Sequence, residues 1–138
     1  MVFASLGFIA LLVVPTLDHR FGWGSSFLVA ESRGAVVGFA QFVRRSAESA
    51  ELTRIYVLPA QQRGGIGTRL LEAGLAECAE ECLKRLTVSV ERDYRIGRRF
   101  YEQSGFGELR EHPQDVRGFA LDLVEYRHLI SWAEGRSC

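Results

Sequence analysis

Short apolar runs alternate with polar turns along the first half of the chain, which is typical of strands joined by tight connections. Residues 27–31 and 35–43 are two such runs, and the turn residues 32–34 between them predict a hairpin of antiparallel strands. A third strand is predicted over residues 51–58, and Pro59 ends it because proline has no N–H to donate to a sheet. This part of the chain therefore predicts three strands.

The next segment has the period of a helix. Leu71, Leu75, Cys78 and Cys82 lie at positions i, i+4, i+7 and i+11, which form one stripe of a helix predicted over residues 66–83. A free cysteine on such a stripe behaves as a small buried hydrophobe. We therefore expect both cysteines to pack in the core.

The last third of the chain predicts further strands and a second helix. Residues 86–90 alternate between apolar and polar side chains as in a strand, and a helix is predicted over residues 94–104. Strands are predicted at 106–110 and 119–125, joined by a polar loop that contains Pro113. Strands lead and trail while both element types alternate in the middle. The pattern thus predicts an α/β (α+β) fold with a mixed central sheet of about six strands, flanked by helices.

The N-terminal segment, residues 2–15, is almost entirely apolar and has no Lys or Arg ahead of it. A membrane-spanning helix needs about 20 apolar residues, and a secretory signal needs a positive region before its apolar stretch. The segment meets neither condition. It predicts a buried strand or helix of the core, or an exposed apolar arm that packs on a second subunit, and both interpretations stay open.

The composition fits one globular domain over residues 1–138. Hydrophobic residues make up 47% of the chain and charged residues 25%, close to the globular average. Seventeen basic residues balance seventeen acidic ones, which argues against a general nucleic-acid binder. The three cysteines contain no C-x-x-C pair and the three histidines are scattered, so we expect neither a disulfide framework nor a metal site. Reduced thiols in a cytoplasmic protein, with no membrane partner, fit best.

The stretch with the clearest chemical meaning is the loop over residues 58–68. It contains Gly64, Gly65 and Gly67 between a predicted strand and a predicted helix. Glycines let the backbone approach a phosphate, and the first N–H groups of a helix point toward such an anion. The loop lacks the G-x-x-x-x-G-K-[ST] motif and no G-x-G-x-x-G follows a strand. Glycines alone therefore leave both a phosphate site and a structural turn open.

Two motifs in the right order decide between these interpretations. Gln62-x-x-Gly65-x-Gly67 follows the strand and precedes the amphipathic helix, and residues 97–106 are GRRFYEQSGF. The first resembles the coenzyme A loop of the GNAT acetyltransferase superfamily, and the second resembles the "FYEKxGF" helix end of the same superfamily. The predicted strand 86–90 lies between them, and the resemblance covers residues 27–130.

The resemblance implies acetyl-CoA as cosubstrate and assigns residues to it. Backbone N–H groups of the loop would wrap the pyrophosphate, and the central strand would hold the pantetheine arm and the thioester. In such enzymes this strand carries a bulge and separates from the next parallel strand, which opens a V-shaped slot for the cofactor. The implied cofactor-binding residues are Ile55, Tyr56, Val57, Gln62, Arg63, Gly64, Gly65, Ile66, Gly67 and Thr68.

The resemblance also implies the reaction, which is acetyl transfer to a primary amine of a small molecule or peptide by direct attack in a ternary complex, without a metal. Tyr101 occupies the position of the family tyrosine that gives a proton to the departing thiolate. Glu51 occupies the start of the central strand, where some relatives carry a glutamate base. The plainer alternatives are a core aromatic for Tyr101, and for Glu51 a strand carboxylate or a salt bridge to a neighbouring arginine.

Three departures from the family pattern bear on this expectation. Gly64 stands where the loop commonly has arginine, with Arg63 before it, and Tyr94 stands where the second helix often has asparagine. Arg95, Arg98 and Arg99 are alternative cationic contacts for the phosphates. The region before residue 27 is about half as long as in relatives, where the additional elements normally wall the acceptor site. Either residues 2–14 alone take this role, or a partner subunit completes the site, or the true start of the protein lies upstream. A non-catalytic CoA-binding or interaction subunit is therefore the alternative, and we expect a homodimer, with the apolar N-terminus as a candidate interface.

Overall fold

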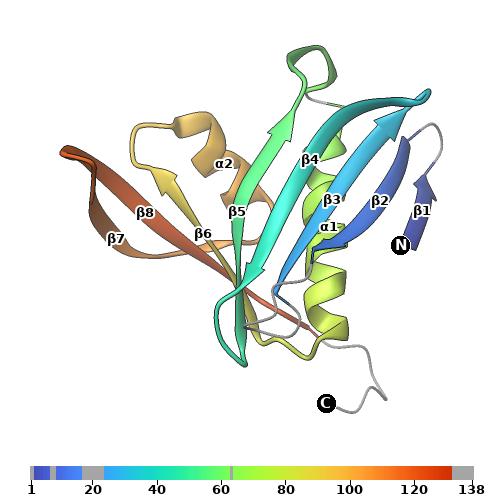
Figure 1. Ribbon diagram of the computed structural model, residues 1–138. Helices are drawn as coiled ribbons and strands as arrows, with labels where there is room; N and C mark the ends of the chain where they lie inside the picture. The colour runs from blue at the N-terminus through green and yellow to red at the C-terminus, as the bar shows by residue number, and fades with distance from the viewer. Residues whose placement is uncertain (1, 7–8, 17–23, 63, 132–138) are drawn as a thin grey trace.

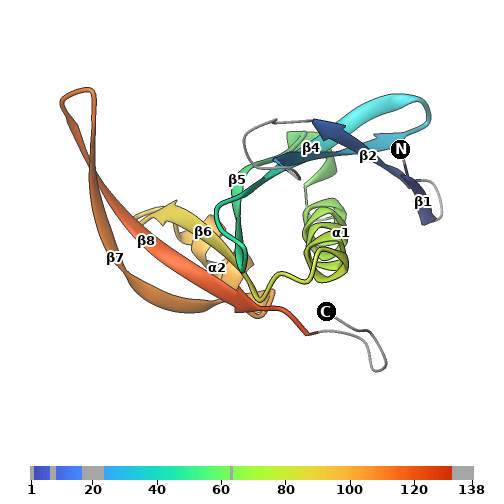
Figure 2. The same cartoon turned by 60° about the horizontal axis from the view of Figure 1, so that its bottom comes forward.

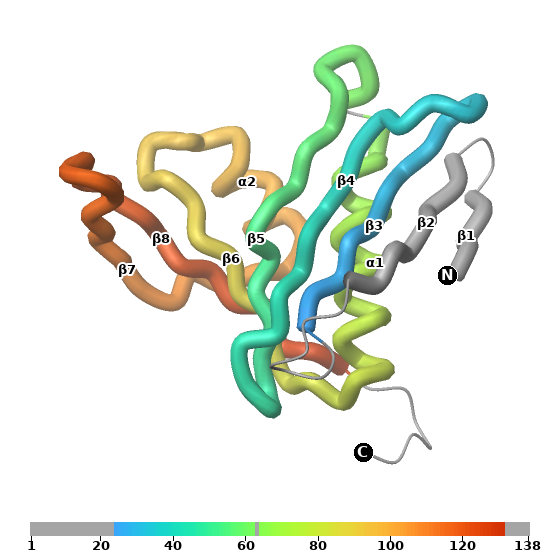
Figure 3. Tube along the Cα trace, in the orientation of Figure 1, coloured from blue at the N-terminus to red at the C-terminus, as the bar shows by residue number. Residues whose placement is uncertain are grey.

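The computed structural model of the protein describes residues 2–6, 9–16, 24–62 and 64–131, with the backbone alone described for 2–6 and 9–16. These residues form one sheet, two α-helices and a short 3₁₀ turn (Figures 1 and 3). The elements are β1 (Val2–Leu6), β2 (Ile9–Thr16), β3 (Ser25–Ser32), β4 (Ala35–Arg44), β5 (Ser49–Val57), η1 (Pro59–Gln61), α1 (Ile66–Glu80), β6 (Arg85–Glu91), α2 (Arg95–Gln103), β7 (Gly107–Val116) and β8 (Phe119–Leu129).

The sheet has the strand order β1-β2-β3-β4-β5-β6-β8-β7 in the described part of the chain. Every neighbouring pair is antiparallel except β5 and β6, which run parallel at the centre. The predicted mixed sheet of about six strands is confirmed in β3 to β8. The apolar N-terminal segment forms the hairpin β1–β2, which extends the sheet beyond β3.

Both helices lie on the same side of the sheet (Figure 2). The helix α1 packs across β3, β4, β5 and β6, and Leu70, Leu71 and Cys78 are buried along its inner face. Gly74 lies in the same face because the ring of Phe42 from β4 needs its space: a Cβ at Gly74 would lie 2.1 Å from Cζ of that ring. This close approach sets the distance between α1 and the sheet.

Among the predicted boundaries, the ends of α1 and of β7 are wrong, the first for a local reason and the second because of the place of β7 in the sheet. The helix α1 ends at Glu80 and not at residue 83, because Cys82 adopts a left-handed conformation with φ of 59°. Cys82 is disulfide-bonded, so the expectation of a packed, reduced thiol is correct for Cys78 alone. The strand β7 continues through Pro113, which was predicted to lie in a loop. Proline is tolerated there because β7 is the last strand of the sheet, with one free edge.

Candidate active site

The parallel strands β5 and β6 separate almost as soon as they meet. Only three residue pairs join them, and the last is Glu51 opposite Thr87. Beyond this pair the two strands diverge as the arms of a V (Figure 1). The cause is a bulge: the partner of Gln41 in β4 is Arg54, whereas the partner of the next residue is Leu52, so Thr53 is an extra residue in β5. The implied bulge and slot are therefore both present.

Beyond the bulge, β5 has an edge that faces the slot and does not pair with β6. The side chains of Ile55 and Val57 pack against the core. Tyr56 points to the face of the sheet opposite α1, where its ring lies 5.9 Å from that of Phe39 and is 47% exposed. The three implied pantetheine residues thus lie along the open edge. The Val57 carbonyl accepts a hydrogen bond of 3.1 Å from Nε2 of Gln62.

The loop after β5 leads directly into the first turn of α1. Gly65 is the N-cap and has a left-handed conformation with φ of 81°, which favours glycine. A Cβ at Gly65 would have no atom within 4 Å, so the backbone there borders open space. The first N–H groups of a helix have no acceptor within the helix. In α1 these groups follow directly after Gly65, next to the open space. Arg63 lies outside the described residues.

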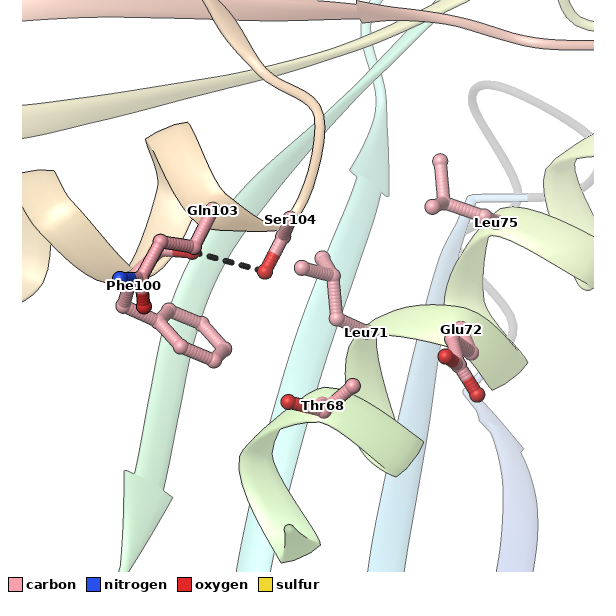
Figure 4. Close-up of a pocket in the computed structure, with 7 residues that line it drawn as sticks. All are labelled: Thr68, Leu71, Glu72, Leu75, Phe100, Gln103 and Ser104. Carbon is pink, nitrogen blue, oxygen red and sulfur yellow. Dashed lines mark hydrogen bonds between the residues drawn. The ribbon is translucent and has the colours of Figure 1, made fainter. Parts of the chain in front are cut away.

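The three residues after Gly65 have different surroundings. Ile66 is buried and anchors the helix start in the core. Gly67 lies close to the ring of Phe100 from α2, since a Cβ there would meet that ring at 3.4 Å. Thr68 is exposed. It also borders a groove of about 270 Å³ between the two helices, which Leu71, Glu72, Leu75, Phe100, Gln103 and Ser104 complete (Figure 4).

Tyr101 lies on the inner face of α2 and is 6% exposed. Its ring packs edge to face on Phe100 and Phe106, with ring centroids 5.1 and 5.5 Å away. In the described part of the chain the Tyr101 hydroxyl has no hydrogen-bond partner. Every fully buried side-chain oxygen or nitrogen among these residues does have a partner, so the Tyr101 oxygen is not fully buried. The hydroxyl therefore retains some solvent contact. Burial, with a smaller contribution from Tyr94, raises the pKa of Tyr101 to about 12, so the phenol stays protonated at neutral pH.

Glu51 lies at the closed end of the V, on the face of the sheet opposite α1. Its neighbours Ala50 and Leu52 are buried on the α1 side, whereas the Glu51 side chain is 28% exposed. Nε and Nη2 of Arg45 donate to the same carboxylate oxygen, Oε1, at 2.8 and 2.7 Å. The other oxygen, Oε2, has no partner among the described residues. The structure thus contains the salt bridge expected as the plainer alternative and leaves one oxygen open.

The structure also contains a polar cluster that the sequence did not predict. Tyr126 of β8 is buried, and its hydroxyl lies between Arg98 and Glu102 of α2. Arg98 is therefore engaged inside the protein, whereas Arg95 and Arg99 are exposed on α2. A tyrosine inside an alternating strand carries no sequence signal of such a partner, because 28 residues separate Tyr126 from Arg98.

The described residues contain no group of three or more His, Cys, Asp or Glu side chains placed to hold a metal ion. None of the helices in the described part is long and apolar enough to span a membrane. The absence of a metal and of a membrane partner stay predictions of the sequence.

The family model of the GNAT acetyltransferases matches residues 8–106 of the chain. The protein therefore belongs to the GNAT acetyltransferase family, as the two motifs predicted. Its fold is the fold of that family.

The relatives found by sequence are named N-acetyltransferases. An uncharacterized N-acetyltransferase of Mycobacterium bovis is 30% identical over 81 residues, which cover 59% of this chain and 52% of the relative. YhfO, an uncharacterized N-acetyltransferase of Bacillus subtilis, is 34% identical over 90 residues, covering 61% of this chain and 60% of the relative. The chain thus matches about half the length of the mycobacterial relative.

Solved structures share the architecture. A GNAT family protein from Desulfovibrio desulfuricans has a TM-score of 0.70 and 25% identity, covering 78% of this chain and 70% of that one. YncA of Salmonella typhimurium, solved with its cofactor acetyl-CoA, has a TM-score of 0.67 and 26% identity, covering 83% of this chain and 70% of that one.

Proposed function

We propose that the protein is an acetyl-CoA-dependent N-acetyltransferase that moves an acetyl group to a primary amine of a small molecule or peptide. The observation that carries the proposal is the separation of β5 from β6 directly after Glu51 and Thr87, with an open strand edge between a glycine-lined helix start and a solvent-contacting phenol. The open edge, the helix start and the phenol are the features that the thioester and the phosphates of acetyl-CoA need. The family and the acetyl-CoA of YncA support the choice of donor.

Groups of this chain suit each part of acetyl-CoA, from the pyrophosphate to the thioester. The N-terminus of α1, with Gly65 open to solvent and Thr68 exposed, suits a pyrophosphate because helix N-termini attract anions. The unpaired edge of β5 over Ile55, Tyr56 and Val57 offers backbone groups to the amide-containing pantetheine arm. We assign the thioester to the slot near the bulge, where strand N–H groups can polarise its carbonyl.

Proton transfer completes the reaction. The amine nitrogen attacks the thioester carbonyl carbon, the carbon–sulfur bond breaks, and the sulfur leaves as a thiolate that needs a proton. Tyr101 supplies that proton, because its phenol is protonated at neutral pH and its hydroxyl has no competing partner in the described part of the chain.

The amine must lose a proton before or during attack. We assign this role to Glu51, directly or through one water, since its Oε2 is open and it lies at the closed end of the slot. The two contacts from Arg45 to Oε1 hold the carboxylate in place and leave Oε2 directed away from the guanidinium.

The non-catalytic CoA-binding or interaction subunit is the weaker candidate, because the slot, the helix start and the phenol are all present. A homodimer through the N-terminal hairpin and a cytoplasmic location remain part of the proposal. The acceptor is left as a primary amine, with no narrower class.

The test is turnover with a panel of primary amines, including amino acids, polyamines, aminoglycosides and peptides, followed as release of the free CoA thiol. We expect at least one amine to be acetylated, with the product confirmed by a mass increase of one acetyl group. Saturable acetyl-CoA binding without turnover on any amine would favour the non-catalytic alternative.

A further inference from the structure

The helix that carries Tyr101 has few apolar contacts of its own. Of the nine residues of α2, only Gly97 and Tyr101 are buried, and the charged side chains of Arg95 and Arg99 are exposed. Helices of this length are unstable in isolation and depend on packing. The orientation of α2, and with it the place of the Tyr101 hydroxyl, must therefore be set by further contacts.

A buried phenol on β8 supplies such contacts. The Tyr126 hydroxyl accepts a hydrogen bond of 2.9 Å from Nε of Arg98 and donates one of 2.8 Å to Oε1 of Glu102. Arg98 and Glu102 are four residues apart and so lie on one face of α2. Together they hold the hydroxyl on both its acceptor and its donor side, and Tyr126 is fully buried.

Arg98 extends the same network to two further segments. Its Nη1 donates to the carbonyl of Arg92, in the turn between β6 and α2, at 3.0 Å. Its Nη2 lies 3.6 Å from Oε2 of Glu108 in β7. One guanidinium thus joins α2 to three neighbouring segments, and its hydrogen bonds to Tyr126 and Arg92 have a charged donor, which makes them stronger than neutral ones.

The network lies next to the phenol that we assign as proton donor. Tyr101 is on the helical turn between Arg98 and Glu102, and its ring centroid lies 6.4 Å from that of Tyr126. A tilt or a slide of α2 on β8 would therefore displace Tyr101 directly.

We propose that Tyr126 is a positioning residue for acetyl transfer: its hydroxyl, held between Arg98 and Glu102, fixes α2 in the orientation that directs the Tyr101 hydroxyl into the slot. This inference rests on the proposed function, because it takes Tyr101 as the proton donor.

The test is a double-mutant cycle on kcat and on KM for acetyl-CoA, with Tyr126→Phe, Tyr101→Phe and the double variant. Tyr126→Phe keeps the ring and removes only the oxygen. We expect it to lower kcat by about ten- to a hundredfold, the scale for a misplacement of about 1 Å, with KM for acetyl-CoA nearly unchanged. In the Tyr101→Phe background, Tyr126→Phe should have almost no further effect, because both changes act through one group.

Arg110→Gln is the matched control. It breaks the ion pair between Arg110 and Glu125. Glu125 directly precedes Tyr126 on β8, so its side chain points to the opposite face of the sheet. We expect kcat to stay at the wild-type value. If Tyr126→Phe does not fold, Glu102→Ala replaces it, since Glu102 is exposed and its loss removes the acceptor of the Tyr126 hydroxyl.

Each alternative outcome has a distinct meaning. Wild-type kcat in Tyr126→Phe, or multiplied losses in the double variant, would overturn the positioning role while leaving the acetyltransferase intact. Wild-type kcat in Tyr101→Phe would instead remove the proton donor from the proposed function. Absence of turnover in the wild type would overturn both proposals.

Discussion

Replacing Tyr101 by phenylalanine separates the effect on the chemical step from the effect on stability. The substitution keeps a ring that contacts Phe100 and Phe106. It removes a hydroxyl that has no hydrogen-bond partner within the described part of the chain. No buried group is left unsatisfied, so we expect the free energy of unfolding to change by less than about 1 kcal/mol.

The effect on the rate should be much larger. Loss of a general acid costs about 10²- to 10⁴-fold in rate, and allowing for partial replacement by water we expect a fall in kcat of about 10- to 10⁴-fold. This range corresponds to roughly 1.4 to 5.5 kcal/mol of transition-state stabilisation. The affinity for acetyl-CoA should not change, because the pyrophosphate and the pantetheine arm are assigned to α1 and β5.

The assay follows thiol release at saturating acetyl-CoA and amine, beside thermal unfolding of both proteins. An unchanged kcat would refute the assignment of Tyr101 as proton donor. A fall in kcat accompanied by an equal loss of stability or of acetyl-CoA affinity would show that the hydroxyl acts through packing and not through proton transfer.

Four other predictions concern Glu51, the packing of Gly74, the two buried groups with raised pKa, and Thr68. Glu51→Gln should lower kcat by about 10²- to 10⁴-fold with little change in unfolding temperature, since the exposed ion pair with Arg45 contributes under about 1 kcal/mol; an unaffected kcat would leave water as the base. Gly74→Ala places a Cβ 2.1 Å from a buried ring, so unfolding should need about 1 to 3 kcal/mol less despite the better helix propensity of alanine, and an unchanged denaturant midpoint would contradict the close packing. Burial raises the pKa of Tyr101 from 10.0 to about 12 and that of Cys78 from 9.0 to about 12. The stability that these two neutral groups give the folded protein is therefore complete below pH 9, and a few kcal/mol of it is lost between about pH 9 and 12. The unfolding temperature should fall over this pH range, and it should fall less steeply in Tyr101→Phe. Thr68→Glu should weaken acetyl-CoA binding at least tenfold because its carboxylate repels the phosphates, while leaving the free protein as stable or slightly more so, as titration calorimetry and unfolding would show.

The predictable parts of this protein are those encoded by neighbouring residues. The loop over residues 58–68 and the segment over residues 97–106 each carry their geometry in consecutive residues, so their positions on α1 and α2 were correct. Gly65 illustrates this, since its left-handed conformation and the helix start that it caps depend on a few adjacent positions.

The parts that sequence could not predict depend on long-range contacts. The two partners of Tyr126 lie on another element, α2, and nothing in the strand pattern distinguishes this tyrosine from an ordinary core residue. The sequence predicts a loop at Pro113 because proline is usually excluded from strands. The strand β7 accepts Pro113 because it lies at the edge of the sheet, and only the strand order reveals that position. For Glu51 the sequence predicts the position in the strand, but it does not predict the two contacts with Arg45.

The most direct test of the central claim is the thermal unfolding midpoint with and without acetyl-CoA, for the wild type and for Thr68→Glu. A ligand at about 100 times its Kd adds roughly 2.7 kcal/mol to the native state, which in a chain of this size should raise the midpoint by about 5 to 10 °C. We predict such a shift for the wild type and a much smaller one, at the same acetyl-CoA concentration, for Thr68→Glu. A folded wild-type protein whose midpoint does not move at any acetyl-CoA concentration would contradict the account.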